Sequence, residues 1–304
     1  MTVQVRLDEL VELRHQARSL GLAAHHRVNS HLVGLYASVF RGQGMDFDEV
    51  REYREGDDIR NMDWRVTART GKPHLKLFRE ERGRDVLLCV DVGSHMSFGT
   101  RGTFKQVAAA RAAALIGWAA SDRRDRVGAV LYGERHQHLF RPSASRQAMW
   151  AMLRALSGDD AHRTAMDGGL LTALERMNRG APTGALLFVI GDFNRCRDAL
   201  DAALGRLRQR HEVVLVPVDD PADWALPAMG DVAFVDESGR RVVVDTDDAG
   251  ARRDYERQWL DRRKALEARA FKLGVEVIPV RTDQDVHVDL HRGLARRAMR
   301  RAVR

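Results

Sequence analysis

The stretch Val86-Leu-Leu-Cys-Val90, followed directly by Asp91, decides the fold class of this 304-residue chain. An uninterrupted apolar run of this kind is typical of a strand that is buried on both faces of a sheet. Four similar runs follow it, and helical stretches lie between them. The runs are 127–132, 185–190, 213–218 and 275–280, and the helical stretches are 104–120, 146–156, 169–177, 195–210 and 248–273. Strands that alternate with helices form βαβ units, so the sequence predicts an α/β protein with a mostly parallel sheet and helices on both faces.

Two short segments do not follow this alternation. Residues 135–141 are predicted to form an antiparallel edge strand. Residues 232–235 and 241–244 flank a polar turn, and we expect them to form a hairpin that is inserted before the last long helix.

Residues 1–84 differ from the rest of the chain in their pattern of apolar and charged residues. Residues 7–24 have the spacing of an amphipathic helix, and residues 31–84 mix short strand-like pieces with a dense charged segment. We therefore expect a small N-terminal subdomain, a helix followed by a β-rich part, over residues 1–84. The main domain is predicted over residues 85–290, and a basic amphipathic helix over residues 291–304.

The net charge of +7 arises in the last part of the chain. Residues 251–304 contain 15 Arg and Lys against 8 Asp and Glu, so residues 1–250 are neutral overall. A general nucleic-acid-binding surface would not be confined in this way, and we expect no nucleic-acid partner. Two cysteines exclude a disulfide scaffold. Because the first residues lack the order of a signal peptide and no apolar stretch is long enough to span a bilayer, we expect a soluble, cytoplasmic protein without a transmembrane segment.

Two of the predicted strands run straight into an aspartate, the first into Asp91 and the third into Asp192. Ligands of an open parallel sheet bind beyond the carboxyl ends of its strands. If these strands are neighbours, both carboxylates reach one crevice, where they would suit Mg²⁺ or Mn²⁺. The other interpretation is that each aspartate only caps the helix that follows it. The sequence leaves both open.

Other reaction chemistries find little support in the sequence. There is no G-x-x-x-x-G-K-[ST] loop for a nucleotide and no G-x-S-x-G elbow for a nucleophilic serine. An aspartyl-phosphate enzyme would need a second aspartate two residues after Asp91, where Gly93 stands. The reaction class that these residues leave open is a metal-dependent hydrolase or phosphotransfer enzyme that uses Asp91 and Asp192.

The segment 46–65 is the most distinctive of the chain. Acidic residues and arginines alternate in it around Tyr53, Ile59 and Trp64, which predicts a turn that Arg–carboxylate pairs hold over an aromatic anchor. This network either stabilises the fold or takes part in binding. The residues assigned to it are Arg54, Asp57, Asp58, Arg60, Asp63 and Trp64.

Three motifs in this part of the chain resemble a known family. Residues 51–69 contain R-x-Y-x-x-G-D-D-x-R-x-x-D-W-x-x-x-A-R, residues 80–85 read EERGRD, and residues 90–99 read VDVGSHMSFG. Together they resemble the domain of unknown function 58 family, in which this run leads into a von Willebrand factor A-like domain. The resemblance covers residues 34–135 closely, and the strand end at 192–193 also fits it.

The resemblance implies a three-layer αβα sandwich around a mostly parallel sheet. It also implies a non-enzymatic protein-interaction module that works with a MoxR-type AAA+ ATPase. Such pairs serve the assembly or maturation of other protein complexes, so the partners would be the ATPase and a client protein.

A metal site is implied by the same resemblance. Such A-type domains bind Mg²⁺ through an Asp-x-Ser-x-Ser loop, a later threonine and a later aspartate. Asp91, Thr164 and Asp192 match these positions here, whereas Gly93 and His95 replace the two hydroxyl ligands. We expect weak binding of Mg²⁺ or Mn²⁺, or none, and a crevice that is kept as a protein-docking surface.

The last residues of the chain are predicted to form a helix with an apolar and a basic face. Apolar residues of 294–303 share one side, and six arginines of 292–304 fill the other. Three roles stay open. The helix covers the sheet domain, docks on an acidic partner, or lies on anionic lipid.

Overall fold

The computed structural model describes residues 2–20, 45–54, 57, 59, 62–80, 83–133, 136–158, 164–165, 169–195, 199–235 and 239–302. The chain forms two compact units. The main unit comprises Met1–Ala23 and Arg84–Arg304, and the small unit comprises Ala24–Gly83. The structure thus divides the predicted N-terminal subdomain over residues 1–84, because the first helices belong to the main unit.

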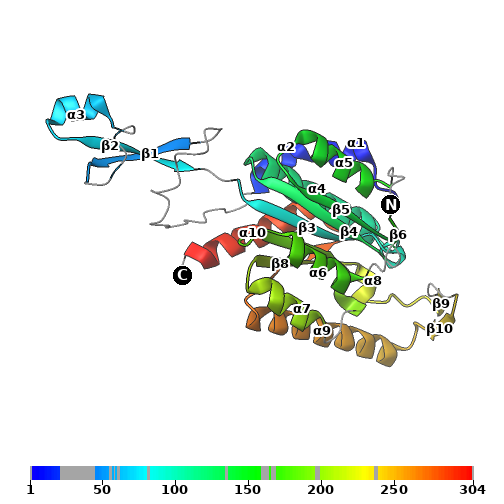
Figure 1. Cartoon of the computed structure of the whole chain (residues 1–304). Coiled ribbons are helices and arrows are strands. Elements are labelled where there is room, and N and C mark those ends of the chain that lie inside the picture. Colours follow the sequence, from blue (N-terminus) through cyan, green and yellow to red (C-terminus); the bar gives the residue numbers. More distant parts are fainter. Residues whose placement is uncertain are drawn as a thin grey trace. The chain divides into compact units, whose positions relative to one another are not determined.

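A mostly parallel sheet lies at the centre of the main unit (Figure 1). Its described strands are β3 (Asp85–Asp91), β4 (Arg126–Tyr132), β5 (His136–Ser143), β6 (Thr164–Ala165), β7 (Leu186–Gly191), β8 (Glu212–Asp219), β11 (Glu276–Val277) and β12 (Val280–Arg281). They lie in the order β11-β8-β7-β3-β4-β5-β6, and β12 also pairs with β8. Strand β5 is antiparallel to β4, as predicted, but it is not the edge of the sheet because β6 pairs with its outer side.

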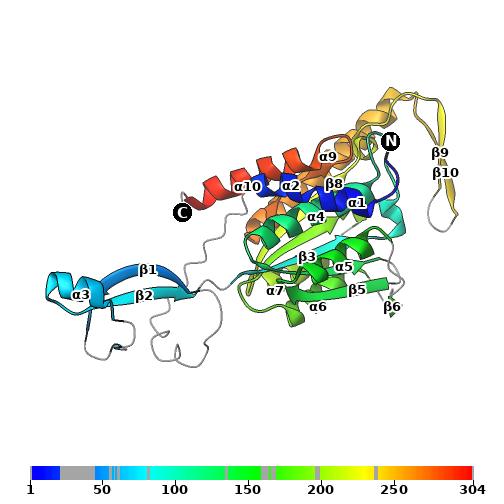
Figure 2. The same cartoon turned by 90° about the horizontal axis from the view of Figure 1, so that it is seen from above.

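Helices cover both faces of the sheet, which makes the three-layer α/β/α sandwich that was expected (Figures 1 and 2). One face is covered by α1 (Leu7–Glu12), α2 (Arg14–Ala17), α4 (Lys105–Asp122), α5 (Arg146–Leu156) and α10 (Val286–Ala302), and the other by α6 (Leu170–Gly180), α7 (Ala199–Arg208) and α9 (Ala249–Lys272). Each face of the sheet has its own hydrophobic core, and β3 contributes alternate residues to the two. Val86 and Leu88 belong to the first core, on the face that α4 covers, and Leu87 and Cys89 belong to the second core, on the face that α6 covers. The sheet is therefore buried on both faces.

Helix α4 is buried on nearly all sides. Its apolar residues pack against β3, β4 and β7 beneath it and against α1, α2, α5 and α10 around it. The indole of Trp118 donates a hydrogen bond to the carbonyl of Leu10 in α1 at 2.9 Å, and Arg111 pairs with Glu9 of the same helix. A helix that is apolar all round is typical of such a core position. Among the described residues, no helix is both long and apolar enough to cross a membrane.

The strand predicted at 275–280 is interrupted. Strands β11 and β12 pair with β8 on either side of Ile278 and Pro279. The backbone N–H of Ile278 still donates to Leu215 at 2.8 Å. Pro279 has no N–H to continue the ladder, so the apolar pattern of the sequence could not show this break.

Helix α10 covers the sheet domain with its apolar face. It begins at Val286, before the expected residue 291, and Leu290 and Leu294 are buried in the first core. The guanidinium of Arg297 is also buried, and it pairs with Glu212 at 2.6 Å and with Glu276 at 3.2 Å. Of the three roles that the sequence left open, the structure shows this covering role.

The predicted hairpin is confirmed. Strands β9 (Asp231–Val235) and β10 (Arg241–Asp245) pair antiparallel before α9, and the hairpin extends away from the sheet (Figure 2).

The small unit consists of a two-stranded antiparallel ribbon and one short helix, as far as the structure describes it. Strand β1 (Met45–Glu52) pairs with β2 (His74–Glu80), and α3 (Trp64–Thr70) lies between them in the chain. Asp63 caps α3 by accepting hydrogen bonds from the backbone N–H groups of Arg65 and Val66. The described residues of this region thus contain two strands, which pair with each other.

Candidate functional site

The site lies where the order of the strands changes direction. From β3 the chain passes through α4 to β4 on one side, and it later returns to place β7 on the other side. Val90 of β3 stands opposite Ile190 of β7 in a parallel ladder, so the two strands end together at the same edge. This confirms that the strands leading to Asp91 and Asp192 are neighbours. Such a switch point is where open α/β sheets place ligands.

Asp91, the last residue of β3, is buried, and both of its carboxylate oxygens contact neighbouring polar groups. One carboxylate oxygen accepts a hydrogen bond from the backbone N–H of Gly93 at 3.0 Å. The other lies 2.9 Å from Nε2 of His95 and accepts a hydrogen bond from the hydroxyl of Tyr132 at 3.3 Å. These contacts fix the side chain in the loop that follows β3.

The same contacts explain the glycine at position 191. A Cβ atom on Gly191 would lie 2.7 Å from the Cβ of Asp91 and 2.9 Å from the hydroxyl of Tyr132. Separations of this size are far inside van der Waals contact. Any side chain at the end of β7 would therefore displace Asp91 or Tyr132.

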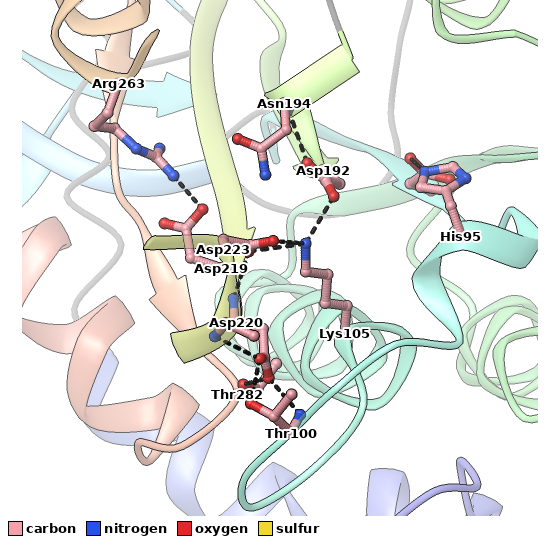
Figure 3. Close-up of polar contacts among 12 residues, drawn as sticks. His95, Thr100, Lys105, Asp192, Asn194, Asp219, Asp220, Asp223, Arg263 and Thr282 are labelled. Atoms are coloured by element: carbon pink, nitrogen blue, oxygen red, sulfur yellow. Dashed lines mark hydrogen bonds and ion pairs between the residues drawn. The ribbon is translucent and has the colours of Figure 1, made fainter. Parts of the chain in front are cut away.

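Asp192 makes a different set of contacts (Figure 3). Its carboxylate accepts a hydrogen bond from the backbone N–H of Asn194 at 2.8 Å and binds the ammonium of Lys105 at 2.7 Å. Lys105 is the first residue of α4, and its side chain is only 2% exposed. Its ammonium also lies 2.9 Å from Asp223, so one buried cation joins two carboxylates.

Asp223 comes from a short, tightly capped helix after β8. Asp220 caps α8 (Pro221–Trp224), and the side chain of Asp223 in turn accepts the backbone N–H of Asp220 at 2.7 Å, which completes a capping box. Asp220 also accepts hydrogen bonds from the backbone of Thr100 at 2.9 Å and from the hydroxyl of Thr282 at 2.6 Å. The loops after β3, β8 and β12 are thereby tied together (Figure 3).

The pKa values of these groups follow their surroundings. Burial alone would lower the pKa of Lys105, but the charges of Asp192 and Asp223 outweigh it and raise the pKa. Burial alone would raise the pKa of Asp192, yet the Lys105 ammonium lowers it, with smaller contributions from Asn194 and His95. Both groups are therefore charged at neutral pH.

One ammonium does not compensate every carboxylate of this cluster. Burial raises the pKa of Asp223 in spite of its contact with Lys105. Burial also raises the pKa of Asp219, the last residue of β8, to about 6, although the guanidinium of Arg263 pairs with it and opposes the shift. The cluster thus holds more acidic groups than cations.

The structure brings together only part of the predicted metal ligands. Gly93 and His95 lie with Asp91 in one loop, and Asp192 follows the neighbouring strand. Thr164 lies in β6, which is separated from β3 by β4 and β5, and its side chain is outside the described residues.

The residues present do not fit Mg²⁺ or Mn²⁺. Asp91 is held by Gly93, His95 and Tyr132, and Asp192 is bound to an ammonium that repels a second cation. In the part of the chain that the structure describes, no group of three His, Cys, Asp or Glu side chains is arranged to hold a metal ion.

The residues predicted for the small unit form a more open arrangement. The guanidinium of Arg51 binds both oxygens of Asp57, at 2.8 and 2.7 Å, and the backbone N–H of Arg54 donates to Asp57 at 2.8 Å. An Arg–carboxylate pair is therefore present, while Glu55, Gly56 and Asp58 of the predicted turn lie outside the described residues. Trp64 does not anchor this turn, because its side chain is 68% exposed. Asp58 and Arg60 lie outside the described residues.

Several residues of the main site were not found by the sequence reasoning. Tyr132, Asp219 and Asp223 follow or end strands far from Asp91 in the chain, and no local motif marks them. Lys105 does carry a signal. It is one of only five lysines beside 45 arginines, and it stands in the first turn of a helix, where the helix dipole disfavours a cation. Such a residue needs compensating carboxylates.

Apolar side chains are exposed on the loop that follows β3. Val92 is 42% exposed and Phe98 is 38% exposed. The ammonium of Lys105 lies 5.7 Å from the centre of the Phe98 ring, so this ring stands next to the buried cation. The loop therefore carries two exposed apolar side chains, and one of them, Phe98, lies beside the buried ammonium.

Comparison with known proteins gives one family and several relatives. The sequence profile of the family described as "Protein of unknown function DUF58" matches residues 49–265. An uncharacterised protein of Mycobacterium tuberculosis (strain ATCC 25618 / H37Rv) is 30% identical over 284 residues, 92% of this chain and 88% of that protein. An uncharacterised protein of Mycobacterium avium is 28% identical over 141 residues, 46% of this chain and 83% of that protein.

Two solved structures are similar to this chain at a low level. An aerotolerance-related membrane protein from Bacteroides fragilis NCTC 9343 has a TM-score of 0.44 and 15% identity, over 70% of this chain and 100% of that one. The protein described as von Willebrand factor type A from Catenulispora acidiphila has a TM-score of 0.41 and 12% identity, over 72% of this chain and 43% of that one. At these scores neither likeness carries an argument about function.

Proposed function

This chain belongs to the DUF58 family, and from that premise we propose that it is a non-enzymatic interaction module, an adaptor for a MoxR-type AAA+ ATPase in the assembly or maturation of protein complexes. The ATPase and the client protein are the partners that the family resemblance implies. The sequence contains no nucleotide-binding loop of the G-x-x-x-x-G-K-[ST] kind, so the energy for remodelling would come from the partner.

One observation carries this proposal. The carboxylates at the ends of the strands are held by hydrogen bonds and ion pairs within the protein, whereas the loop beside them exposes apolar side chains. Asp91 contacts Gly93, His95 and Tyr132, and Asp192 contacts Lys105. A general base or nucleophile must reach a substrate with a free lone pair, whereas an apolar surface suits contact with a protein.

The proposal is tested by co-purification with matched surface variants. Tagged protein is mixed with the MoxR-type ATPase of its source organism, with and without ATP. Val92→Glu places a charge on the loop beside the site, and Val288→Glu is the control because Val288 of α10 is 46% exposed, close to the 42% of Val92. We expect Val92→Glu to reduce retention of the ATPase and Val288→Glu to leave it unchanged. Equal retention by both variants contradicts the proposed surface.

The enzyme alternative has its own test. A metal-dependent hydrolase or phosphotransferase that uses Asp91 and Asp192 would turn over phosphate esters in the presence of Mn²⁺. We expect no such turnover. Mn²⁺-dependent hydrolysis that Asp192→Asn abolishes would contradict the adaptor proposal and would show that the protein is a metal-dependent enzyme.

A further inference from the structure

We propose that the ammonium of Lys105 is the permanent cation of this site and takes the position that a divalent metal ion would need between Asp192 and Asp223. The site is then independent of metal ions. This inference concerns the chain itself and does not depend on the identity of a partner protein.

The geometry of the ammonium supports this role. Its nitrogen lies 2.7 Å from Asp192, which directly follows β7, and 2.9 Å from Asp223 of α8, the short helix after the adjacent strand β8. An ammonium has three donors and no acceptor, so it can donate to both carboxylates at once. Figure 3 shows Lys105 reaching between the two aspartates. A metal ion joining the same oxygens would overlap the ammonium.

The burial of the cluster makes a cation obligatory. The side chains of Asp192 and Asp223 are 11% and 13% exposed, and neither can be solvated as a free surface carboxylate is. An ionised group that is removed from water needs an opposite charge and hydrogen bonds. Here a residue of the chain supplies that charge at every metal concentration.

The choice of lysine in an arginine-rich chain fits the same role. Forty-five of the 50 basic residues are arginines, yet the position between Asp192 and Asp223 has a lysine. A guanidinium is a wide, planar fork, whereas an ammonium is a compact point charge that fits between two carboxylates. The position at the start of α4 also keeps the nitrogen close to the carboxyl ends of the strands.

The burial of the Lys105 ammonium affects how a partner is recognised. In a metal site with an open coordination position, a carboxylate of the partner can bind the ion. The side chain of Lys105 is 2% exposed and its ammonium stands beside Phe98, so a carboxylate from outside does not reach it. Recognition at this edge is then made by exposed groups such as Val92 and Phe98.

The inference is tested by thermal unfolding in EDTA and in Mg²⁺, Mn²⁺ or Ca²⁺. The wild type is expected to have the same Tm in all of these solutions. Lys105→Met keeps most of the length of the side chain and removes its charge, and it is expected to lower the Tm in EDTA by roughly 5–10 °C. Mn²⁺ is expected to restore part of this loss, because the uncompensated carboxylates then bind the metal. Lys264→Met, on the exposed face of α9, is the control. It is expected to have the Tm of the wild type both in EDTA and in Mn²⁺.

Two results would overturn the inference. One is a wild type that Mg²⁺ or Mn²⁺ stabilises and whose response disappears in Asp192→Asn. The other is a folded Lys105→Met variant with the Tm of the wild type in EDTA. If Lys105→Met does not fold, calorimetric titration of Mg²⁺ and Mn²⁺ into the wild type decides, since the inference requires that no binding heat is observed.

Discussion

The Lys105–Asp192 pair of the main unit and the Arg51–Asp57 pair of the small unit join a basic and an acidic group at the same distance, 2.7 Å, in different surroundings. The side chains of the first pair are 2% and 11% exposed, and those of the second pair are 33% and 22% exposed. Water and salt screen an open pair, whereas a buried charge without its partner has nothing to replace it. The depth of a pair in the fold, rather than its geometry, therefore decides how much stability depends on it.

The largest difference is expected when the basic residue of each pair is replaced. Lys105→Met leaves two buried carboxylates without their cation, and we expect it to reduce the free energy of unfolding by about 3–5 kcal/mol. Arg51→Met removes the cation of the open pair. Urea denaturation of both variants measures the contrast, and equal shifts of the two midpoints would contradict the role of burial.

A second large effect is expected at the end of β7. Gly191→Ser introduces a Cβ at 2.7 Å from that of Asp91 and at 2.9 Å from the hydroxyl of Tyr132, and we expect this overpacking to cost about 3 kcal/mol. Gly180→Ser is the matched control, since a Cβ there meets nothing within 4 Å. If both serine variants have the same urea midpoint, the close packing around Asp91 is contradicted.

The excess of acid in the buried cluster predicts a pH effect. Because the pKa of Asp219 is raised to about 6, the folded protein binds a proton more tightly than the unfolded chain at this residue. Its contribution to stability is therefore present at low pH and is lost as the pH rises from about 4 to 6. We expect Asp219→Asn to gain about 2 kcal/mol relative to the wild type between pH 4 and pH 7. Urea denaturation at both pH values checks the sign, and a relative loss over this range would contradict it.

The smallest effect is expected at the acid of the open pair. The hydrogen bond from Arg51 and the backbone N–H of Arg54 lower the pKa of Asp57, so its contribution is present at neutral pH and is lost as the pH falls below about 4. Because both side chains are accessible to water, we expect Asp57→Asn to leave the urea midpoint within experimental error at pH 7. A shift as large as that of Lys105→Met would show that this pair is more important than its exposure indicates.

Much of the fold follows from patterns that are local in the sequence. The apolar run 86–90 predicts a buried strand, and its alternate residues do face two cores. Residues 275–280 do not follow their local pattern, because hydropathy alone predicts one strand and Pro279 divides it into two. The exposure of Trp64 is not predictable either, because an aromatic residue within a charged motif does not reveal whether it is buried.

The site is predictable only in part because its contacts join residues that are far apart in the sequence. Asp91 and Asp192 are marked by the strands that precede them, and the adjacency of those strands is confirmed. Lys105 lies 87 residues from Asp192 and 118 from Asp223, and no spacing rule connects residues so far apart. What the sequence does show is a single lysine in an unfavourable helix position.

The ammonium group of Lys105 offers the most direct test of the central claim. Protein labelled with ¹⁵N at its five lysines is examined by ¹H–¹⁵N NMR of the ammonium groups at neutral pH, in EDTA and in Mg²⁺. A buried, ion-paired ammonium predicts one resonance that exchanges slowly with water, is the same in both solutions and shifts in Asp192→Asn. Five ammonium groups that all exchange rapidly, or a slow resonance that Mg²⁺ removes, would contradict the account.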